Sequence, residues 1–194
     1  MLDLHVRELR ACPCGASSRR EHHEPMVGFA LNTMDSTTVS NCISMYFKNS
    51  SDSESKCPTC NRVSCRELSR QLLAVPDAFY AQVNRFIFDP HRALVPGYVG
   101  RLDDRSVTLT PTVDLPFDGS TVPFTLVAVA LFSGTSLKSG HWTATTLDRP
   151  RSNQHRWTHY DDMKSVKTSF PQQTNSYLPC QFFYVRSSLL FLCG

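Results

Sequence analysis

The sequence lacks several features that define well-known classes of protein. No apolar run approaches the ~20 residues that span a membrane, and the first ten residues, MLDLHVRELR, are charged throughout, unlike a secretory signal peptide. Its 20 Lys and Arg against 17 Asp and Glu give a net charge of +3, too weak and too scattered for a nucleic-acid-binding surface. We therefore expect no membrane and no nucleic acid among its partners, and a cytoplasmic or nuclear location.

The cysteines are distributed unevenly along the chain. Six of the eight lie within residues 1–65, whereas residues 70–194 hold most of the aromatic and strand-like runs. In a reducing compartment, cysteines indicate metal binding, chemistry or core packing rather than disulfides. With 194 residues, 41% of them apolar, the chain suits one domain, or one domain with a small appendage.

The stretch DSTTVSNCISMYF (35–47) predicts a short amphipathic helix. Ser36 or Thr37 can cap its first turn. One face of this helix then carries four residues at the spacing i, i+3, i+4 and i+7: Val39, Cys42, Ile43 and Tyr46.

The later part of the chain predicts mainly strands. Aromatic and β-branched runs suit a strand at 79–88, 106–115, 124–132, 141–147, 155–160 and 180–193. The run FTLVAVALF (124–132) is continuously apolar, as in a central strand that is buried on both faces. For RELSRQLLA (66–74) the pattern leaves helix and strand open.

Two of these runs predict a hairpin that brings His141 close to Asp161. If the turn is centred near Arg151, these two residues lie directly opposite each other, with Cβ atoms ~5 Å apart. The carboxylate would then hold one ring N–H of the imidazole and leave the other nitrogen as a base. The alternative is an ordinary surface hairpin with a histidine at its rim.

The residues around this pair suit a functional site. Gly140 precedes the histidine and would let another chain approach closely. Trp157 and Tyr160 would shield the site from water.

These residues are part of a longer series of motifs. The run FTLVAVALFSGTSLKSGHWTATTL and the following RWTHYDD resemble the histidine box of the ubiquitin-specific proteases: Y-x-L-x-A-V-x-x-H-x-G, then G-H-Y-x-A, then W-x-x-[FY]-[DN]-D. The stretches VPDAFYAQVNRF (75–86), VTLTPTVDL (107–115) and SYLPCQFFYVR (176–186) resemble further segments of that family in the same order. Two departures are Phe132, where the family usually has a non-catalytic histidine, and Trp142, where it has tyrosine.

The resemblance implies the α+β fold of a papain-like cysteine peptidase over residues 8–188. Residues 8–64 would form the fingers with one helix, residues 65–188 would form the β-rich palm, and the helical thumb with its Cys box would be missing. The implied site is a catalytic His141 with Asp161 as its orienting carboxylate and Asp162 in support. The implied substrate-binding residues are Gly140, Trp142 and Tyr160.

The nucleophile of the family is not found in this sequence. In the family it lies in a box like G-L-x-N-x-G-N-x-C-x-x-N, and no stretch here matches it. Asn41 precedes Cys42, but Cys42 lies on the apolar face of the predicted helix, so we expect it in the core. The 194 residues alone are therefore expected to be inactive.

A structural zinc ion is also implied, since the family holds one between two C-x-x-C knuckles at the fingertips. The expected ligands are Cys12, Cys14, Cys57 and Cys60. The first pair is separated by one residue, and neighbouring side chains diverge on an extended backbone, so Cys12 could be replaced by His22 or His23. The alternative is a finger without metal. The remaining cysteines are expected in the core or in strands: Cys65, Cys180 and Cys193.

Three functions remain open. The first is the C-terminal part of a deubiquitinating cysteine protease, which acts on ubiquitinated proteins with a segment that supplies the thumb and the Cys box. The second is a non-catalytic remnant that binds ubiquitin. The third is a zinc-containing β module with an unrelated partner.

Overall fold

The computed structural model describes residues 2–31, 38–52, 56–63, 66–87, 100–136, 139–148, 156–174 and 176–190. Strands dominate, and the described residues include one helix of nine residues and one of four. No helix among them is long and apolar enough to cross a membrane.

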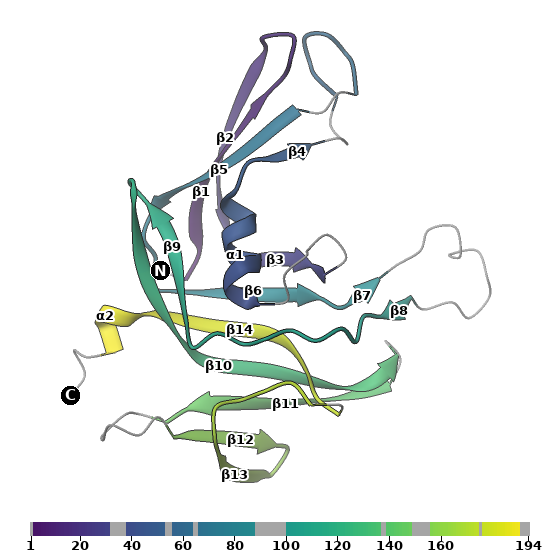
Figure 1. Ribbon diagram of the computed structural model, residues 1–194, viewed down its shortest axis with the longest axis vertical. Helices are drawn as coiled ribbons and strands as arrows, with labels where there is room; N and C mark the ends of the chain where they lie inside the picture. Colours follow the sequence, from purple (N-terminus) through teal and green to yellow (C-terminus); the bar gives the residue numbers. More distant parts are fainter. Residues whose placement is uncertain are drawn as a thin grey trace.

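A four-stranded antiparallel sheet projects from the rest of the molecule (Figure 1). Its order is β2–β1–β5–β4, with bounds β1 (Leu4–Ala11), β2 (Ser17–Glu24), β4 (Ser50–Asp52) and β5 (Arg66–Ala74). Residues 66–74, which the pattern left open, are thus a strand, and they pair with β1 and β4 on either side. We call this the finger sheet.

A larger, eight-stranded sheet forms the body of the molecule, and we call it the palm sheet. Its order is β13–β12–β11–β10–β14–β6–β3, and β9 also pairs with β10. The strands are β3 (Val27–Ala30), β6 (Ala78–Asn84), β9 (Thr112–Phe117), β10 (Ser120–Ser136), β11 (Ser139–Leu147), β12 (Trp157–Asp161), β13 (Lys164–Thr168) and β14 (Leu178–Arg186). The pairs are antiparallel except for β3 with β6, and a separate two-stranded ladder joins β7 (Phe86–Ile87) to β8 (Arg101–Leu102).

The predicted helix is α1 (Val39–Phe47), and it lies between the two sheets (Figure 1). The side chain of Thr38 caps it by accepting a hydrogen bond from the Asn41 amide at 3.2 Å. The cap residues expected from the sequence, Ser36 and Thr37, lie outside the described residues. The apolar face of the helix is confirmed, and Cys42 is a core residue, as predicted.

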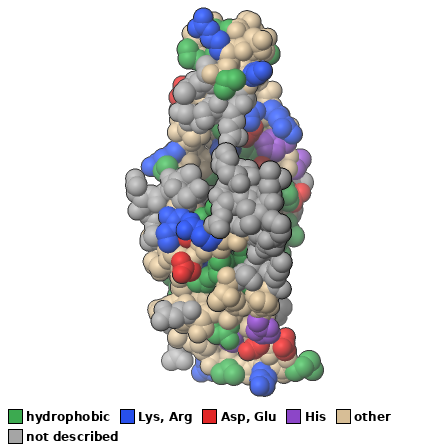
Figure 2. All heavy atoms as spheres, turned by 90° about the vertical axis from the view of Figure 1, so that its right-hand side faces the viewer, with side chains coloured by type: hydrophobic (Ala, Val, Ile, Leu, Met, Phe, Trp, Pro, Cys, Tyr) green, Lys and Arg blue, Asp and Glu red, His purple; other side chains and the backbone are tan. Residues whose placement is uncertain are grey.

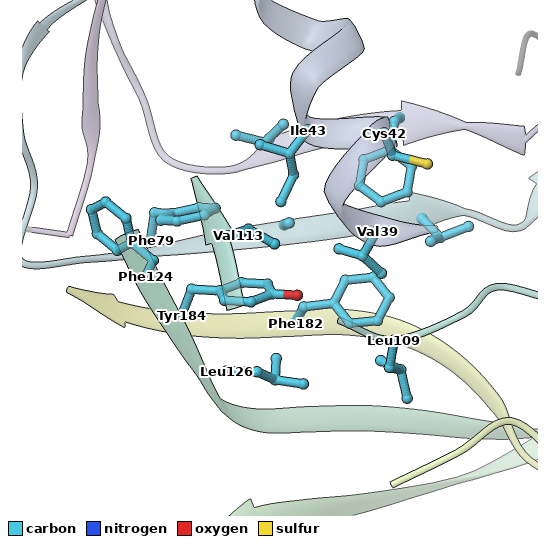
Figure 3. Packing of buried hydrophobic residues seen from close by; sticks show 14 of the residues in the cluster. Val39, Cys42, Ile43, Phe79, Leu109, Val113, Phe124, Leu126, Phe182 and Tyr184 are labelled. Atoms are coloured by element: carbon cyan, nitrogen blue, oxygen red, sulfur yellow. The ribbon is translucent and has the colours of Figure 1, made fainter. Parts of the chain in front are cut away.

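The core fills the space between α1 and the inner face of the palm sheet. Val39 and Ile43 point toward a cluster of aromatic rings in which Phe79 stacks on Tyr184 with centroids 5.4 Å apart (Figure 3). Phe124 meets the edge of Phe79 at 5.1 Å. This layer, packed beneath α1, defines the inner face of the palm sheet.

Strand β10 differs from the prediction that it is buried on both faces. Its inner-facing residues, such as Leu126 and Leu131, are buried, but Val127, Ala128 and Ala130 are only half-buried. On the outer face Phe132 is buried against Phe86 and Trp142, so the continuous apolar run reflects one buried face and one face that is only partly covered.

The last predicted strand, 180–193, ends earlier than expected. β14 stops at Arg186, and α2 (Ser187–Leu190) follows. The ladders with β6 and β10 end at Ala78 and Phe124, opposite Val185 and Arg186. Beyond this point the strand has no partner, so the apolar residues turn into a short helix.

A completely buried arginine links the segments that surround the palm sheet. Arg85 donates through Nε to the carbonyl oxygen of Pro179 at 2.9 Å, and through Nη1 to those of Asp103 and Arg105, both at 2.9 Å. Its Nη2 donates to Oε1 of Gln173 at 3.2 Å. Burial lowers the pKa of Arg85, and the carbonyl dipoles compensate by stabilising the charge. The end of β6, the start of β14 and two loops are thereby fixed to one another.

Candidate functional site

The β11–β12 hairpin forms as predicted, but its register differs by two residues. Ala144 pairs with Tyr160 and Thr145 with His159, which places the hairpin centre one residue later than Arg151. His141 and Asp161 are therefore diagonal neighbours, not directly opposed as the sequence analysis expected. Because side chains on a strand alternate with a period of two, a shift by two keeps both residues on the same face.

His141 and Asp161 are in contact at the open end of this hairpin. The Nε2 atom of His141 lies 2.5 Å from Oδ1 of Asp161, and their side chains are 44% and 38% exposed. Figure 2 shows histidine and acidic side chains together at the lower end of the molecule, where β11–β13 lie. Since Nε2 faces the carboxylate, a neutral imidazole has its proton on that atom and its lone pair on Nδ1. The pair thus presents a base with a fixed tautomer.

The carboxylate also changes the acidity of the imidazole. The hydrogen bond that His141 donates to Asp161 raises the pKa of His141 above its usual value. Partial desolvation opposes this, and the charges of Asp161 and Asp162 add smaller increases. A raised pKa means that the imidazolium form contributes stability at low pH, which is lost as the pH rises through the folded-state value.

We predict that Asp161→Asn lowers the pKa of His141 toward that of a free histidine, because the largest favourable interaction of the imidazolium is removed. Asp162→Asn should lower the pKa less, because this carboxylate acts only through its charge. A proton NMR titration of the His141 ring in both variants measures this. An equal or larger change in the Asp162 variant would show that the contact seen here does not hold in solution.

The residues expected to surround this pair lie elsewhere. Trp142 and Tyr160 are both largely exposed, but alternation places them on the outer face of the hairpin, away from His141. Trp157 shares the inner face with His141 but is buried in the core against Phe170, with ring centroids 5.5 Å apart. It therefore does not shield the pair from water, contrary to expectation.

Gly140 is required by close packing on the outer face. A Cβ atom at this position would lie 2.1 Å from two ring atoms of Phe132, whose ring also packs against Trp142 with centroids 5.1 Å apart. Phe132, at the position where the family usually has histidine, therefore covers the glycine that precedes His141. Gly134, directly opposite Gly140, meets the same ring.

We predict that Gly140→Ala destabilises the protein by roughly 1–3 kcal/mol, the usual cost of overpacking. The matched control is Gly28→Ala, where a Cβ would lie 3.8 Å from Nδ2 of Asn84 in ordinary contact. Urea unfolding with an unchanged slope compares the two midpoints. Equal midpoints for the two variants would mean that the Phe132 ring moves aside without cost.

The four cysteines of the predicted metal site come together at the tip of the finger sheet. The sulfurs of Cys12 and Cys60 lie 3.8 Å apart, those of Cys14 and Cys57 lie 3.7 Å apart, and all four lie within 4.8 Å of one another. A tetrahedron with metal–sulfur bonds of ~2.3 Å has edges of about 3.8 Å. The cysteines therefore have the spacing of a tetrahedral metal centre.

The C-x-C pair converges because it lies in a turn and not in an extended strand. The Gly15 amide donates to the Cys12 carbonyl at 2.9 Å, and Gly15 has a φ of +88°. The second knuckle has a similar turn, in which the Asn61 amide donates to the Cys57 carbonyl at 2.9 Å. Cys12 thus completes the cluster, whereas His22 contacts Glu24 at 2.8 Å.

The backbone of the second knuckle favours a thiolate. Amides of Cys60 and Thr59 donate to the sulfur of Cys57 and lower its pKa to about 6. The Ala16 amide acts on Cys14 in the same direction, but contacts with the neighbouring thiols and burial outweigh it and raise the pKa of Cys14 to about 11. Cys57 and Cys14 thus differ in acidity, and a bound cation would stabilise both as thiolates.

The other described cysteines are buried. Desolvation raises the pKa of both Cys42 and Cys180 to about 11, so neither is a ready nucleophile. Cys65 and Cys193 lie outside the described residues.

Comparison with known proteins identifies the family. The ubiquitin carboxyl-terminal hydrolase family matches residues 15–184, so the chain belongs to this family. This confirms the resemblance found in the sequence and the α+β, papain-like fold that it implied. A search of curated proteins returned no match.

Three solved structures of similar fold contain the same assembly. A chain of the SAGA DUB module of Ubp8, Sgf11, Sus1 and Sgf73 bound to monoubiquitin is 15% identical with a TM-score of 0.72. The yeast SAGA DUB module with an Sgf73 mutant gives 16% and 0.71, and the SAGA module bound to ubiquitin aldehyde gives 14% and 0.70. Each alignment covers 96% of this chain and 41% of the other. The chain therefore spans about two fifths of the length of these relatives.

Proposed function

We propose that the chain is the part of a deubiquitinating cysteine protease that carries the general base and its orienting carboxylate. The observation that supports this most directly is the contact between His141 Nε2 and Asp161 Oδ1 at 2.5 Å, in a chain of the ubiquitin carboxyl-terminal hydrolase family. Two of the similar solved structures are complexes with monoubiquitin and with ubiquitin aldehyde. Palm and fingers, divided near residue 64, would provide much of the surface for ubiquitin.

In the proposed reaction, Nδ1 of His141 takes the proton of a cysteine thiol as its sulfur attacks the carbonyl carbon at the C-terminal glycine of ubiquitin. The imidazolium then gives this proton to the leaving lysine amine as the C–N bond breaks, and a thioester remains. Water, deprotonated by His141, hydrolyses the thioester and regenerates the thiol. Asp161 keeps the ring oriented throughout. Gly140, Trp142 and Tyr160 lie on the outer face of the hairpin, so any contact that they make with the substrate would be on the side away from His141.

The nucleophile in this proposal comes from outside the 194 residues. Among the described cysteines, four form the cluster at the fingertip, and the other two are buried with raised pKa values. This observation also favours a second candidate, a ubiquitin-binding relative without catalytic activity.

The two candidates are separated by supplying a Cys-box segment of the family as a separate polypeptide. We expect the mixture to cleave a fluorogenic ubiquitin amide, the chain alone not to cleave it, and His141→Gln to abolish cleavage while ubiquitin binding, measured calorimetrically, is kept. Binding without cleavage would favour the non-catalytic candidate. No binding of ubiquitin would contradict both.

We also propose that the cysteine cluster holds one structural zinc ion, with Cys12, Cys14, Cys57 and Cys60 as ligands. The edge lengths and the tetrathiol donor set support zinc. Zinc would lock the two turns of the fingertip together and stabilise the finger sheet.

We predict about one zinc per chain in protein purified without chelators, since structural zinc is bound too tightly to be lost by dilution. Cys57→Ser and Cys12→Ser should each abolish stoichiometric zinc, whereas Cys180→Ser, a buried cysteine outside the cluster, should keep it. Elemental analysis gives the ratio. Full zinc in the Cys12 variant would mean that another side chain is the fourth ligand.

A further inference from the structure

A buried hydroxyl group lies beside the His141–Asp161 pair without a partner. The side chain of Thr143 is on β11, and the residue is only 5% exposed. Its Oγ1 atom is buried and makes no hydrogen bond. An unpaired buried hydroxyl costs free energy, so a purely structural position would favour valine, which has the same shape and a higher strand propensity.

The strand register brings this hydroxyl to Asp161. Thr143 shares the inner face with His141, because the two residues are two apart on β11. The ladder between β11 and β12 pairs Ala144 with Tyr160, and the next pair outward is Thr143 and Asp161. Directly opposed residues have Cβ atoms ~5 Å apart, so the hydroxyl and the carboxylate are within reach of a hydrogen bond after a change of rotamer.

The carboxylate has an oxygen available for such a bond. Asp161 contacts Nε2 of His141 through Oδ1, and the described part of the chain provides no hydrogen-bond partner for its Oδ2. The remaining charges near the pair are Asp162 in the turn and Lys164, which lies opposite Asp161 on β13. Neither would fix the rotation of the carboxylate as a hydrogen bond does.

The same sheet already contains this arrangement one pair further along. Thr145 lies directly opposite His159, and its Oγ1 contacts Nδ1 of His159 at 2.9 Å. A threonine on β11 therefore reaches the polar side chain opposite it on β12. We infer that Thr143 is a positioning residue whose hydroxyl donates to Oδ2 of Asp161 and so holds the carboxylate against His141. A role for Thr143 in catalysis rests on the proposed function. The hydrogen bond between Thr143 and Asp161 does not depend on that function.

The bond forms by rotation of one side chain between staggered rotamers. It matters most when a partner covers the site, because a hydroxyl and a carboxylate shielded from water cannot be satisfied by solvent. The sequence analysis did not identify this residue. The sequence does place Thr143 on the same face as His141, two residues further along the strand. Only the observed register, however, places it opposite Asp161.

The test uses Thr143→Val, which removes the hydroxyl and keeps the shape, and Thr143→Ser, which keeps the hydroxyl. Thr145→Val is the matched control on the same face, two residues away. By NMR titration we expect Thr143→Val to lower the pKa of His141 by about half a unit, the scale of one lost orienting interaction. Thr143→Ser and Thr145→Val should leave the pKa of His141 unchanged.

Thermal unfolding provides a second measurement. If the hydroxyl stays unpaired in solution, Thr143→Val should raise the melting temperature, because it removes an unsatisfied polar group. The inference is overturned if that variant has a higher melting temperature or an unaltered His141 pKa. Both measurements use the chain without ubiquitin, so their failure is distinguishable from failure of the proposed function, which ubiquitin binding and cleavage test.

Discussion

The alternation of side chains across the palm sheet is the constraint on which the rest of the structure depends. The inner face that packs against α1 at one end carries His141 and Asp161 at the other. Residues 141, 143, 145 and 147 share that face, and Thr143 and Thr145 on it are buried. Because β10 fixes the faces of β11, a slip of one residue between β11 and β12 would turn Trp157 and Asp161 of β12 to the outer face and separate Asp161 from His141. The core therefore enforces the geometry of the candidate site.

In the finger sheet, turns and not strand register position the candidate metal ligands. This sheet contributes few apolar residues to the core, and β2 is exposed over most of its length. What orders the tip is two tight turns, each with a residue of positive φ, Gly15 and Asn61. These turns bring the sulfurs of the four clustered cysteines within 4.8 Å of one another. A sheet with a small core can thus be stabilised by a metal centre at its tip.

Sequence reasoning reached the contact between His141 and Asp161 although it assigned the wrong pairing. It assumed a turn centre, because Pro150, Ser152 and Asn153 all favour turns and none of them fixes a single centre. The predicted register was wrong by two residues. Because side chains alternate with a period of two, His141 and Asp161 still share one face, but the residue directly opposite Asp161 is Thr143 and not His141. Similarly, C-x-C was expected to diverge because its backbone was assumed to be extended, when Gly15 allows a turn. The local sequence pattern predicts which face of a strand each side chain occupies. The position of a turn and the register between two strands also depend on packing against distant parts of the chain.

The buried charges show how differently the body and the site are built. Arg85 uses four hydrogen bonds to bury its charge, and Glu8 is held between Arg10 and Arg70. Such groups are satisfied within the described chain and rigidify the sheets. At the candidate site, by contrast, Nδ1 of His141 has no hydrogen-bond partner among the described residues, and the hydroxyl of Thr143 gains one only by the rotation inferred above. Arg66 Nε, Thr110 Oγ1 and Arg186 Nε, which lie outside the site, are also buried without a hydrogen-bond partner among the described residues. The feature that distinguishes the candidate site is therefore the contact between His141 and Asp161 and not open polar capacity by itself.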